Sequence, residues 1–144
     1  MSSEKIYFCG SIRAGRDDQP IYAALAEHLT SNYGPVLTQH VASVVQHCDV
    51  GATEQEIHDR DVAWLHECTS VVAECTVPSL GVGYELGLAA VLKKPTLILF
   101  RKADAARSLS AMIRGQKDFT TVDYTTIDEA KKAIDSFYAK LHSK

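Results

Sequence analysis

The feature that most constrains the fold is a regular alternation of short apolar runs with segments of helical periodicity. The runs are four to six residues long and lie at 5–9, 35–38, 70–73, 95–100 and 119–122. This length is typical of buried strands. Strands that alternate with helices form a parallel sheet covered on both faces. We therefore predict an α/β fold with a doubly wound five-stranded parallel sheet, flavodoxin- or Rossmann-like, in the strand order 2-1-3-4-5.

Helix start signals stand between these runs. Side chains that accept hydrogen bonds from free backbone N–H groups are typical of the first turn of a helix. Helical segments are expected near 17–31, 41–45, 53–68, 86–92, 108–114 and 126–141. The capping candidates are Asp17 or Asp18, Thr53 with Glu56, and Thr126 with Glu129.

Length and charge narrow the class of protein. A chain of 144 residues is expected to form a single domain over 1–144 with a sizeable core. The net charge of -3 argues against nucleic acid as a partner, because phosphate backbones need a clustered basic surface. No apolar run reaches membrane-spanning length, and residues 1–5 do not resemble a signal peptide. We expect no membrane partner and a cytoplasmic location, with the nucleus as a second compartment.

Cysteine and histidine spacing gives no indication of a metal site. The four cysteines lack CxxC spacing, and the histidines lack the spacing of zinc ligands. Free buried thiols in a reducing compartment are the simpler interpretation. We therefore expect neither a metal nor a cofactor. The cysteines are Cys9, Cys48, Cys68 and Cys75, and the histidines nearest one another or a cysteine are His40, His47, His58 and His66.

Two glycine-bearing loops are expected to meet in one crevice. In the predicted strand order, the loops at 10–16 and 75–83 flank the topological switch point, where ligands of such folds usually bind. The first loop carries Ser11, Arg13 and Arg16 beside a helix start, a suitable set of donors for a phosphate group. The competing interpretation is a solvated loop with surface arginines.

Two carboxylates stand at unusual positions. Glu85 follows a glycine-bearing stretch and is expected in the first turn of the helix at 86–92, where the helix dipole favours the anion. Asp61 falls on the apolar stripe of the helix at 53–68, where lost hydration is expected to raise its pKa. Glycosidic cleavage uses such a pair. The alternatives are dipole matching for Glu85, and for Asp61 an ion pair with Arg60, with His58 or with the arginine loop.

Four segments together resemble one family. They are YFCGSIR at 7–13, DVAWL at 61–65, PSLGVGYELG at 78–87 and SAMIRG at 110–115. In this order and spacing the chain resembles the 2'-deoxynucleoside 5'-phosphate N-hydrolases, relatives of the nucleoside 2-deoxyribosyltransferases, over about 5–124. The resemblance implies hydrolysis of the N-glycosidic bond of a 2'-deoxynucleoside 5'-monophosphate to a free base and 2-deoxyribose 5-phosphate.

The resemblance also implies roles for individual residues. Glu85 would attack C1' and hold the sugar as a covalent ester, Asp61 would act as acid and base near the leaving base, and Tyr7 would orient Glu85. The loop at 10–16 and Ser79 would bind the 5'-phosphate, and Ser110 and Met112 would reach the site of the other subunit of a homodimer. The implied substrate-binding residues are Gly10, Ser11, Ile12, Arg13, Ala14, Gly15, Arg16, Ser79 and Gly81, with Ser110, Ala111 and Met112 of the partner subunit.

Two other functions remain open at this stage. One is base exchange between deoxynucleosides, as in the transferases, although the arginines of the phosphate loop argue against a substrate without phosphate. The other is a nucleotide-binding module without catalysis. The resemblance also includes a branch of the family that cleaves ribonucleotides and carries the same loop. Within this resemblance, a tyrosine at position 7, and not a phenylalanine, favours a deoxyribose substrate over a ribose substrate. Residues 42–52 match the family weakly, so the resemblance indicates no preferred base.

Overall fold

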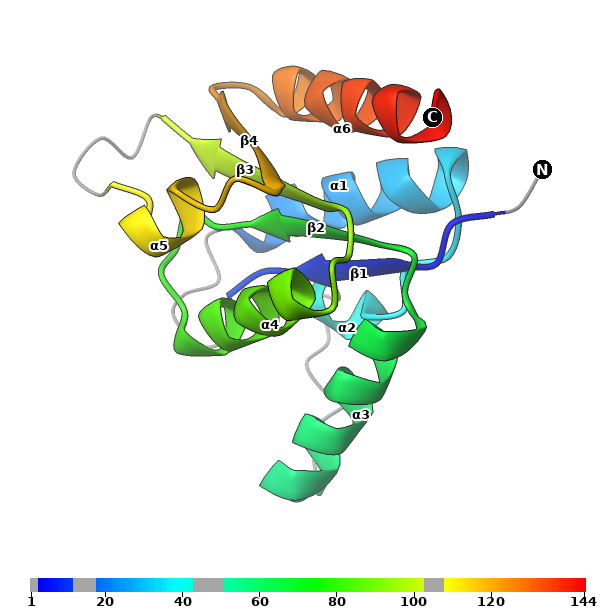
Figure 1. Cartoon of the computed structure of the whole chain (residues 1–144), viewed down its shortest axis with the longest axis vertical. Helices are drawn as coiled ribbons and strands as arrows, with labels where there is room; N and C mark the ends of the chain where they lie inside the picture. Colours follow the sequence, from blue (N-terminus) through cyan, green and yellow to red (C-terminus); the bar gives the residue numbers. More distant parts are fainter. Residues whose placement is uncertain (1–2, 12–17, 43–50, 103–107) are drawn as a thin grey trace.

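A computed structural model describes residues 3–11, 18–42, 51–102 and 108–144. Within these residues, four parallel strands form one sheet in the order β1-β2-β3-β4 (Figure 1). The strands are β1 (Ile6–Cys9), β2 (Ser70–Glu74), β3 (Thr96–Arg101) and β4 (Phe119–Tyr124). The predicted α/β class with a parallel sheet is therefore confirmed, whereas the number of strands is smaller than predicted.

The helices cover both faces of this sheet. Figure 1 shows α1 (Gln19–Asn32) and α6 (Ile127–His142) over one face and α4 (Leu80–Val91) over the other. The short helix α5 (Ala111–Arg114) precedes β4, and α2 (Gln39–Ala42) lies beneath β1. The helix α3 (Glu54–Glu67) runs outward from the body of the molecule, and among its residues only Leu65 is fully buried.

The side chains of β1 alternate between the two faces of the sheet and so contribute to two separate core clusters. Ile6 and Phe8 pack with α1 and α6, whereas Tyr7 and Cys9 pack with α3 and α4. Successive side chains of a strand point to opposite faces of the sheet, so this division is dictated by the strand itself. It places a phenol and a thiol, two residues apart, on the face that carries α4.

The predicted strand at 35–38 is wrong. Val36 forms only an isolated parallel bridge with Ile6, at the outer edge of β1 where the predicted order placed it. Leu37 donates a backbone hydrogen bond to Ile6 (2.8 Å), but the next position is paired through a side chain. The Thr38 hydroxyl accepts from the Phe8 N–H (2.9 Å) and donates to the Phe8 carbonyl (2.7 Å). This side chain replaces the backbone ladder, and α2 begins at the next residue.

The predicted start of the helix at 86 is also wrong. The helix α4 begins at Leu80, and the Ser79 hydroxyl caps it by accepting from the Val82 N–H (3.3 Å). Glu85 therefore lies in the second helical turn rather than the first. Glycine within a helix costs only about 1 kcal/mol relative to alanine. The Ser79 cap and the buried side chains of Val82 and Leu86 offset that cost, so the glycine-bearing stretch is helical.

The other predicted helix starts agree in part. Thr53 and Glu56 form the predicted capping box at the start of α3. At the start of α6 only half of the predicted box is present: the Thr126 hydroxyl accepts from the Glu129 N–H, but the Glu129 carboxylate accepts from the Thr125 N–H and not from that of Thr126. The Asp18 side chain does not cap α1. The helix expected at 108–114 begins at 111. Of the helix expected at 41–45, residues 41 and 42 belong to α2, and the remainder lies outside the described residues. No helix in the described parts of the chain is both long and apolar enough to span a membrane.

Candidate active site

The carboxyl group of Glu85 is the centre of the candidate site. Glu85 of α4 lies within electrostatic reach of the Tyr7 hydroxyl and the Cys9 thiol, two side chains on the same face of β1. Tyr7 and Cys9 are each only 1% exposed. Tyr7 therefore influences the charge of Glu85, whereas its role in orienting Glu85 stays a prediction. The sequence did not indicate the nearby thiol of Cys9.

The electrostatics of Glu85 differ from the sequence-based expectation. Burial raises the pKa of Glu85 to about 7, against the lowering effect of the neighbouring Tyr7 hydroxyl and Cys9 thiol, and the nearby charge of Asp61 raises it further. The expected stabilisation of the anion by the helix N-terminus is absent because Glu85 lies in the second turn, where the dipole effect has faded. Glu85 therefore changes its charge near neutral pH.

Asp61 on α3 lies within electrostatic reach of both Glu85 and Tyr7. Its Oδ1 accepts hydrogen bonds from Arg60 Nε (3.0 Å) and Nη2 (2.9 Å). The side chain of Asp61 is 21% exposed, so it lies at the edge of the core. Asp61 therefore forms the ion pair with Arg60 that the sequence offered as an alternative, and it also lies near Glu85.

Aromatic side chains border Asp61. The Arg60 guanidinium lies over the Trp64 ring, 4.9 Å from its centroid, and the ring of His40 from α2 lies 5.9 Å from that of Trp64. Arg60 Nη2 and His40 Nε2 are 3.4 Å apart. A flat, partly apolar wall therefore stands beside the acid that is expected to assist the leaving base.

Only the beginning of the predicted phosphate loop can be placed. Gly10 and Ser11 are described and buried, whereas Ile12, Arg13, Ala14, Gly15 and Arg16 lie outside the described residues. A side chain at position 10 would put its Cβ 2.9 Å from the Tyr22 ring, so this close approach requires glycine. The Ser11 N–H donates to the Tyr22 hydroxyl (3.1 Å), which fixes where the loop leaves β1.

Two serines that were predicted to contact the phosphate group, Ser79 before α4 and Ser110 before α5, border one groove. Ser79, Leu80, Gly83, Val91, Ser110 and Met112 are among the residues that line it. Gly81 is exposed at the start of α4, and Ala111 is exposed at the start of α5. The Ser110 hydroxyl caps α5 by accepting from the Met112 N–H (3.3 Å). Within one chain Ser79 and Ser110 share this groove, while the Glu85 carboxyl group turns toward β1.

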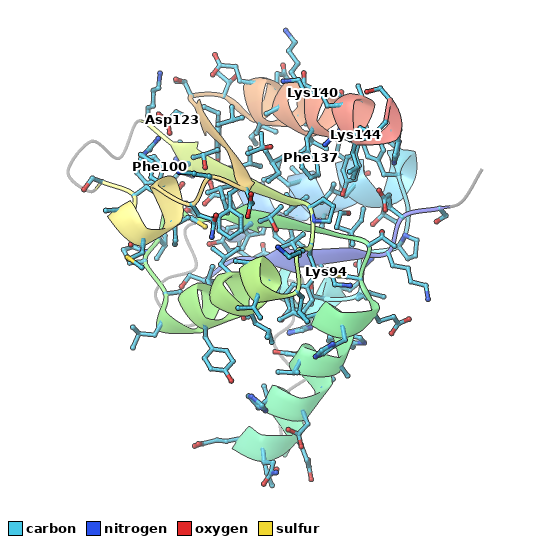
Figure 2. All side chains as sticks on the ribbon, in the orientation of Figure 1. Lys94, Phe100, Asp123, Phe137, Lys140 and Lys144 are labelled. Atoms are coloured by element: carbon cyan, nitrogen blue, oxygen red, sulfur yellow. The ribbon has the colours of Figure 1, made fainter. Side chains whose placement is uncertain are left out.

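The helix α5 is tied to the sheet by one arginine. The Arg114 guanidinium lies over the Phe100 ring, 5.8 Å from its centroid, and pairs with Asp123 (2.9 Å). Figure 2 shows Phe100 and Asp123 on the neighbouring strands β3 and β4, close to α5. Ser110 and Met112 are therefore presented on a helix whose position the sheet determines.

A buried polar network beneath the site was missed by the sequence analysis. Glu74, which is fully buried, accepts from the Thr76 N–H (2.7 Å), from the Thr76 hydroxyl (2.8 Å) and from the Tyr124 hydroxyl. Beside it, Asp18 Oδ1 pairs with Arg101 Nη2 at 2.8 Å. These contacts join the carboxyl ends of β2, β3 and β4 to the start of α1. A glutamate at the end of an otherwise apolar run was the signal that could have indicated it.

Cys9, Cys68 and Cys75 are free and buried, which confirms the interpretation of these three, whereas Cys48 lies outside the described residues. No group of three or more His, Cys, Asp and Glu side chains suited to a metal ion occurs in the part of the chain that the structure describes.

Comparison with known proteins gives these residues a family context. The nucleoside 2-deoxyribosyltransferase family model matches residues 6–135. A 5-hydroxymethyl-dUMP N-hydrolase of Mus musculus is 51% identical over 125 residues, covering 83% of this chain and 71% of that protein. The Homo sapiens protein of the same name is 43% identical over 143 residues, covering 92% of this chain and 78% of that protein.

A solved structure shares the fold. The CMP N-glycosidase BcmB of Clostridium botulinum superposes with a TM-score of 0.67, covering 92% of this chain and 99% of that one, at 16% identity. This likeness concerns the fold alone. The family model spans most of the chain and the relatives are similar over most of their length. The chain therefore belongs to the nucleoside 2-deoxyribosyltransferase family.

Proposed function

We propose that this protein hydrolyses the N-glycosidic bond of a 2'-deoxynucleoside 5'-monophosphate, releasing a free base and 2-deoxyribose 5-phosphate. The observation that carries the proposal is the placement of Glu85, which lies within electrostatic reach of both Tyr7 and Asp61. Relatives named as 5-hydroxymethyl-dUMP N-hydrolases, similar over most of this chain, support the reaction class.

In the proposed first step, a Glu85 carboxylate oxygen bonds to C1' as the bond from C1' to the base nitrogen breaks. The base leaves with the bonding electron pair and takes a proton from Asp61. The transition state is oxocarbenium-like, so the anionic carboxylate stabilises the positive charge that develops on the sugar. A sugar without a 2'-hydroxyl ionises more easily, which lowers the demand on the protein.

In the proposed second step, water opens the glycosyl ester. The water oxygen bonds to C1', the Glu85 carboxylate leaves, and Asp61 accepts the water proton. In this proposal the nearby Tyr7 hydroxyl orients the carboxylate in both steps. Burial and the neighbouring Glu85 raise the pKa of Tyr7, which keeps this hydroxyl protonated and able to donate. The sugar phosphate then dissociates.

Phosphate binding by the loop at 10–16 would position C1' over Glu85. The phosphate is remote from the reacting bond, so its binding energy contributes to orientation and not directly to the chemistry. The placement of Gly10 and Ser11, buried at the carboxyl end of β1, supports this assignment. Ser79, at the N-terminus of α4, is the second proposed phosphate contact.

A panel of nucleotides tests the function. We expect base release from 5-hydroxymethyl-dUMP and from at least one unmodified deoxynucleoside 5'-monophosphate, with the matching ribonucleotides cleaved at least about tenfold more slowly because the 2'-hydroxyl destabilises the transition state. Chromatography of the released base measures each rate. The matching free deoxynucleosides are the control for the phosphate. Absence of base release from every monophosphate would contradict the proposal.

Base exchange is the second candidate. The same incubation with a second free base separates the two reactions, because a transferase yields a new nucleotide while a hydrolase yields the sugar phosphate. The nucleotide-binding module without catalysis is distinguished by ligand binding with no product at all. The hydrolase is favoured because the relatives described above are named as hydrolases of a nucleotide.

We further propose a homodimer with shared sites. The groove between α4 and α5 carries the strongly exposed apolar side chains Leu80 (96%), Val91 (77%) and Met112 (86%). Gly83 and Gly87, which lie beside them, have nothing within 4 Å of an added Cβ. Small residues at this spacing let a helix of a second copy approach closely, and burial of the apolar side chains would stabilise the pair.

Mixing an inactive variant with an impaired one tests the shared site. Chains carrying Glu85→Ala and chains carrying Ser110→Ala are expected to be inactive and impaired, respectively, when alone. Random exchange of subunits forms mixed dimers with one intact site, so about a quarter of the wild-type activity is expected to return. Mixed dimers shown to form without any gain in activity would contradict sharing, and a monomer in sedimentation would contradict the dimer.

A further inference from the structure

One tyrosine near the start of α1 contacts both residues that flank the segment 12–17 of the predicted phosphate loop. Tyr22 is only 2% exposed. Its hydroxyl accepts a hydrogen bond from the Ser11 N–H (3.1 Å), just after the end of β1. Its own backbone N–H donates to the carbonyl of Asp18 (3.0 Å), the residue that precedes α1. The two ends of this segment are therefore joined through a single residue of the helix.

Packing determines where the Tyr22 hydroxyl lies. The Tyr22 ring belongs to the core cluster between the sheet and the helices α1 and α6, and it meets the Phe8 ring edge to face, with the ring centroids 5.9 Å apart. On its other side the ring lies against the backbone of Gly10, where an added Cβ would be 2.9 Å from two ring atoms. Interiors packed at this density transmit the position of one group to the next. The acceptor for the Ser11 N–H is therefore held by the core.

The far end of the segment is held to the sheet as well. The Asp18 side chain is only 4% exposed, and its Oδ1 pairs with Arg101 Nη2 of β3 at 2.8 Å. Ser11 is thus held by α1, and Asp18 by both α1 and β3. A segment whose ends are fixed in advance loses less conformational freedom when it binds a ligand, and this preorganisation increases affinity.

We propose that Tyr22 is a positioning residue for phosphate binding, its buried hydroxyl fixing the Ser11 backbone so that the loop at 10–16 is preorganised for the 5'-phosphate. The inference rests on the proposed function for the identity of the ligand, while the hydrogen bond to Ser11 is a property of the free protein. Tyr22 acts on substrate binding and not on the chemical step, because the proposed reacting groups Glu85 and Asp61 lie on the separate helices α4 and α3.

The test compares Tyr22→Phe with Tyr138→Phe in the full chain. Each substitution removes one buried hydroxyl and keeps the ring that fills the core. Tyr138 is 0% exposed, and its hydroxyl lies 2.8 Å from that of Ser70, the first residue of β2, at the end of the sheet away from the loop. We expect Tyr22→Phe to raise KM for 5-hydroxymethyl-dUMP about fivefold to tenfold, with kcat within about twofold of the wild type. Tyr138→Phe is expected to leave both constants within about twofold.

Two measurements without turnover accompany the kinetics. Calorimetry with 2-deoxyribose 5-phosphate is expected to show the same fivefold to tenfold loss of affinity in Tyr22→Phe, about 1 to 1.4 kcal/mol, and none in Tyr138→Phe. Hydrogen exchange of the Ser11 amide in the free protein is expected to be at least about fivefold faster in Tyr22→Phe and unchanged in Tyr138→Phe.

The outcomes separate this inference from the proposed function. If the wild type binds the sugar phosphate and Tyr22→Phe binds it equally tightly, the inference is overturned and the proposed function stands. Unchanged exchange of the Ser11 amide, an equal loss of affinity in Tyr138→Phe, or a loss confined to kcat would likewise overturn the inference alone. A wild-type protein that binds no sugar phosphate and releases no base would overturn both.

Discussion

Replacing Glu85 with glutamine is expected to lower the rate of base release by at least about a thousandfold, as loss of a nucleophile does in enzymes with covalent intermediates. Glutamine has nearly the same shape as glutamate but does not form the glycosyl ester. Binding of the nucleotide, measured by calorimetry, is expected to persist because the phosphate contacts lie elsewhere. A single-turnover assay of released base measures the loss.

Glu85→Gln is also expected to change the stability of the folded protein. The direction of that change shows whether a loss of activity comes from the missing nucleophile or from misfolding. The pKa of Glu85 is raised from 4.5 to about 7 in the folded protein by burial. The folded state therefore holds a proton that the unfolded state has lost, and stability falls as the pH rises from 4.5 to 7. Glu85→Gln removes this loss, so at pH 8 the variant is expected to unfold at a higher temperature than the wild type.

An exposed glutamate supplies the control for this experiment. Glu67 pairs with Lys5 at the surface (3.0 Å), and Glu67→Gln is expected to change neither base release nor its pH dependence. A Glu85→Gln protein that keeps more than about a tenth of the wild-type rate would contradict the nucleophile assignment. A variant that is inactive but also unfolds at a lower temperature would contradict the electrostatic account of Glu85.

Replacing Arg101 with methionine is expected to produce the largest loss of stability, about 3 to 5 kcal/mol. The Asp18 side chain is only 4% exposed, and its pair with Arg101 Nη2 is 2.8 Å long. Without the guanidinium, a carboxylate remains in a site that gives it little hydration. Thermal unfolding measures the effect, and a fall of roughly 10 °C is expected for a chain of this size.

Two further variants show whether the stranded charge is the cause. Asp18→Asn added to Arg101→Met removes the charge and is expected to recover a large part of the lost stability. The exposed pair of Lys5 and Glu67 is the matched control, and Lys5→Met is expected to change stability by less than about 1 kcal/mol. Equal losses in Arg101→Met and Lys5→Met would contradict the special role of the buried pair.

Elements set by interactions within one helical turn were predictable from the sequence, whereas elements set by contacts between distant residues were not. The capping box at Thr53 was predictable because both partners lie within one turn. The start of α4 was not, because glycines favour turns locally while burial of Val82 and Leu86 against the sheet favours the helix. The strand at 35–38 was over-predicted because Thr38 uses its side chain, a contact thirty residues away in sequence, where a strand would use its backbone.

The sequence by itself determined the α/β class and the family, and it predicted the acidic residues Asp61 and Glu85 as the reacting pair. These follow from periodicity, spacing and motifs, which are properties of neighbouring residues. Only the tertiary structure brought Asp61 and Tyr7 within electrostatic reach of Glu85, joined Glu74 to Tyr124 and raised the pKa of Glu85 to about 7. Hydrogen bonds between distant segments and the loss of hydration depend on which surfaces pack together, and packing arises only when the whole chain has folded.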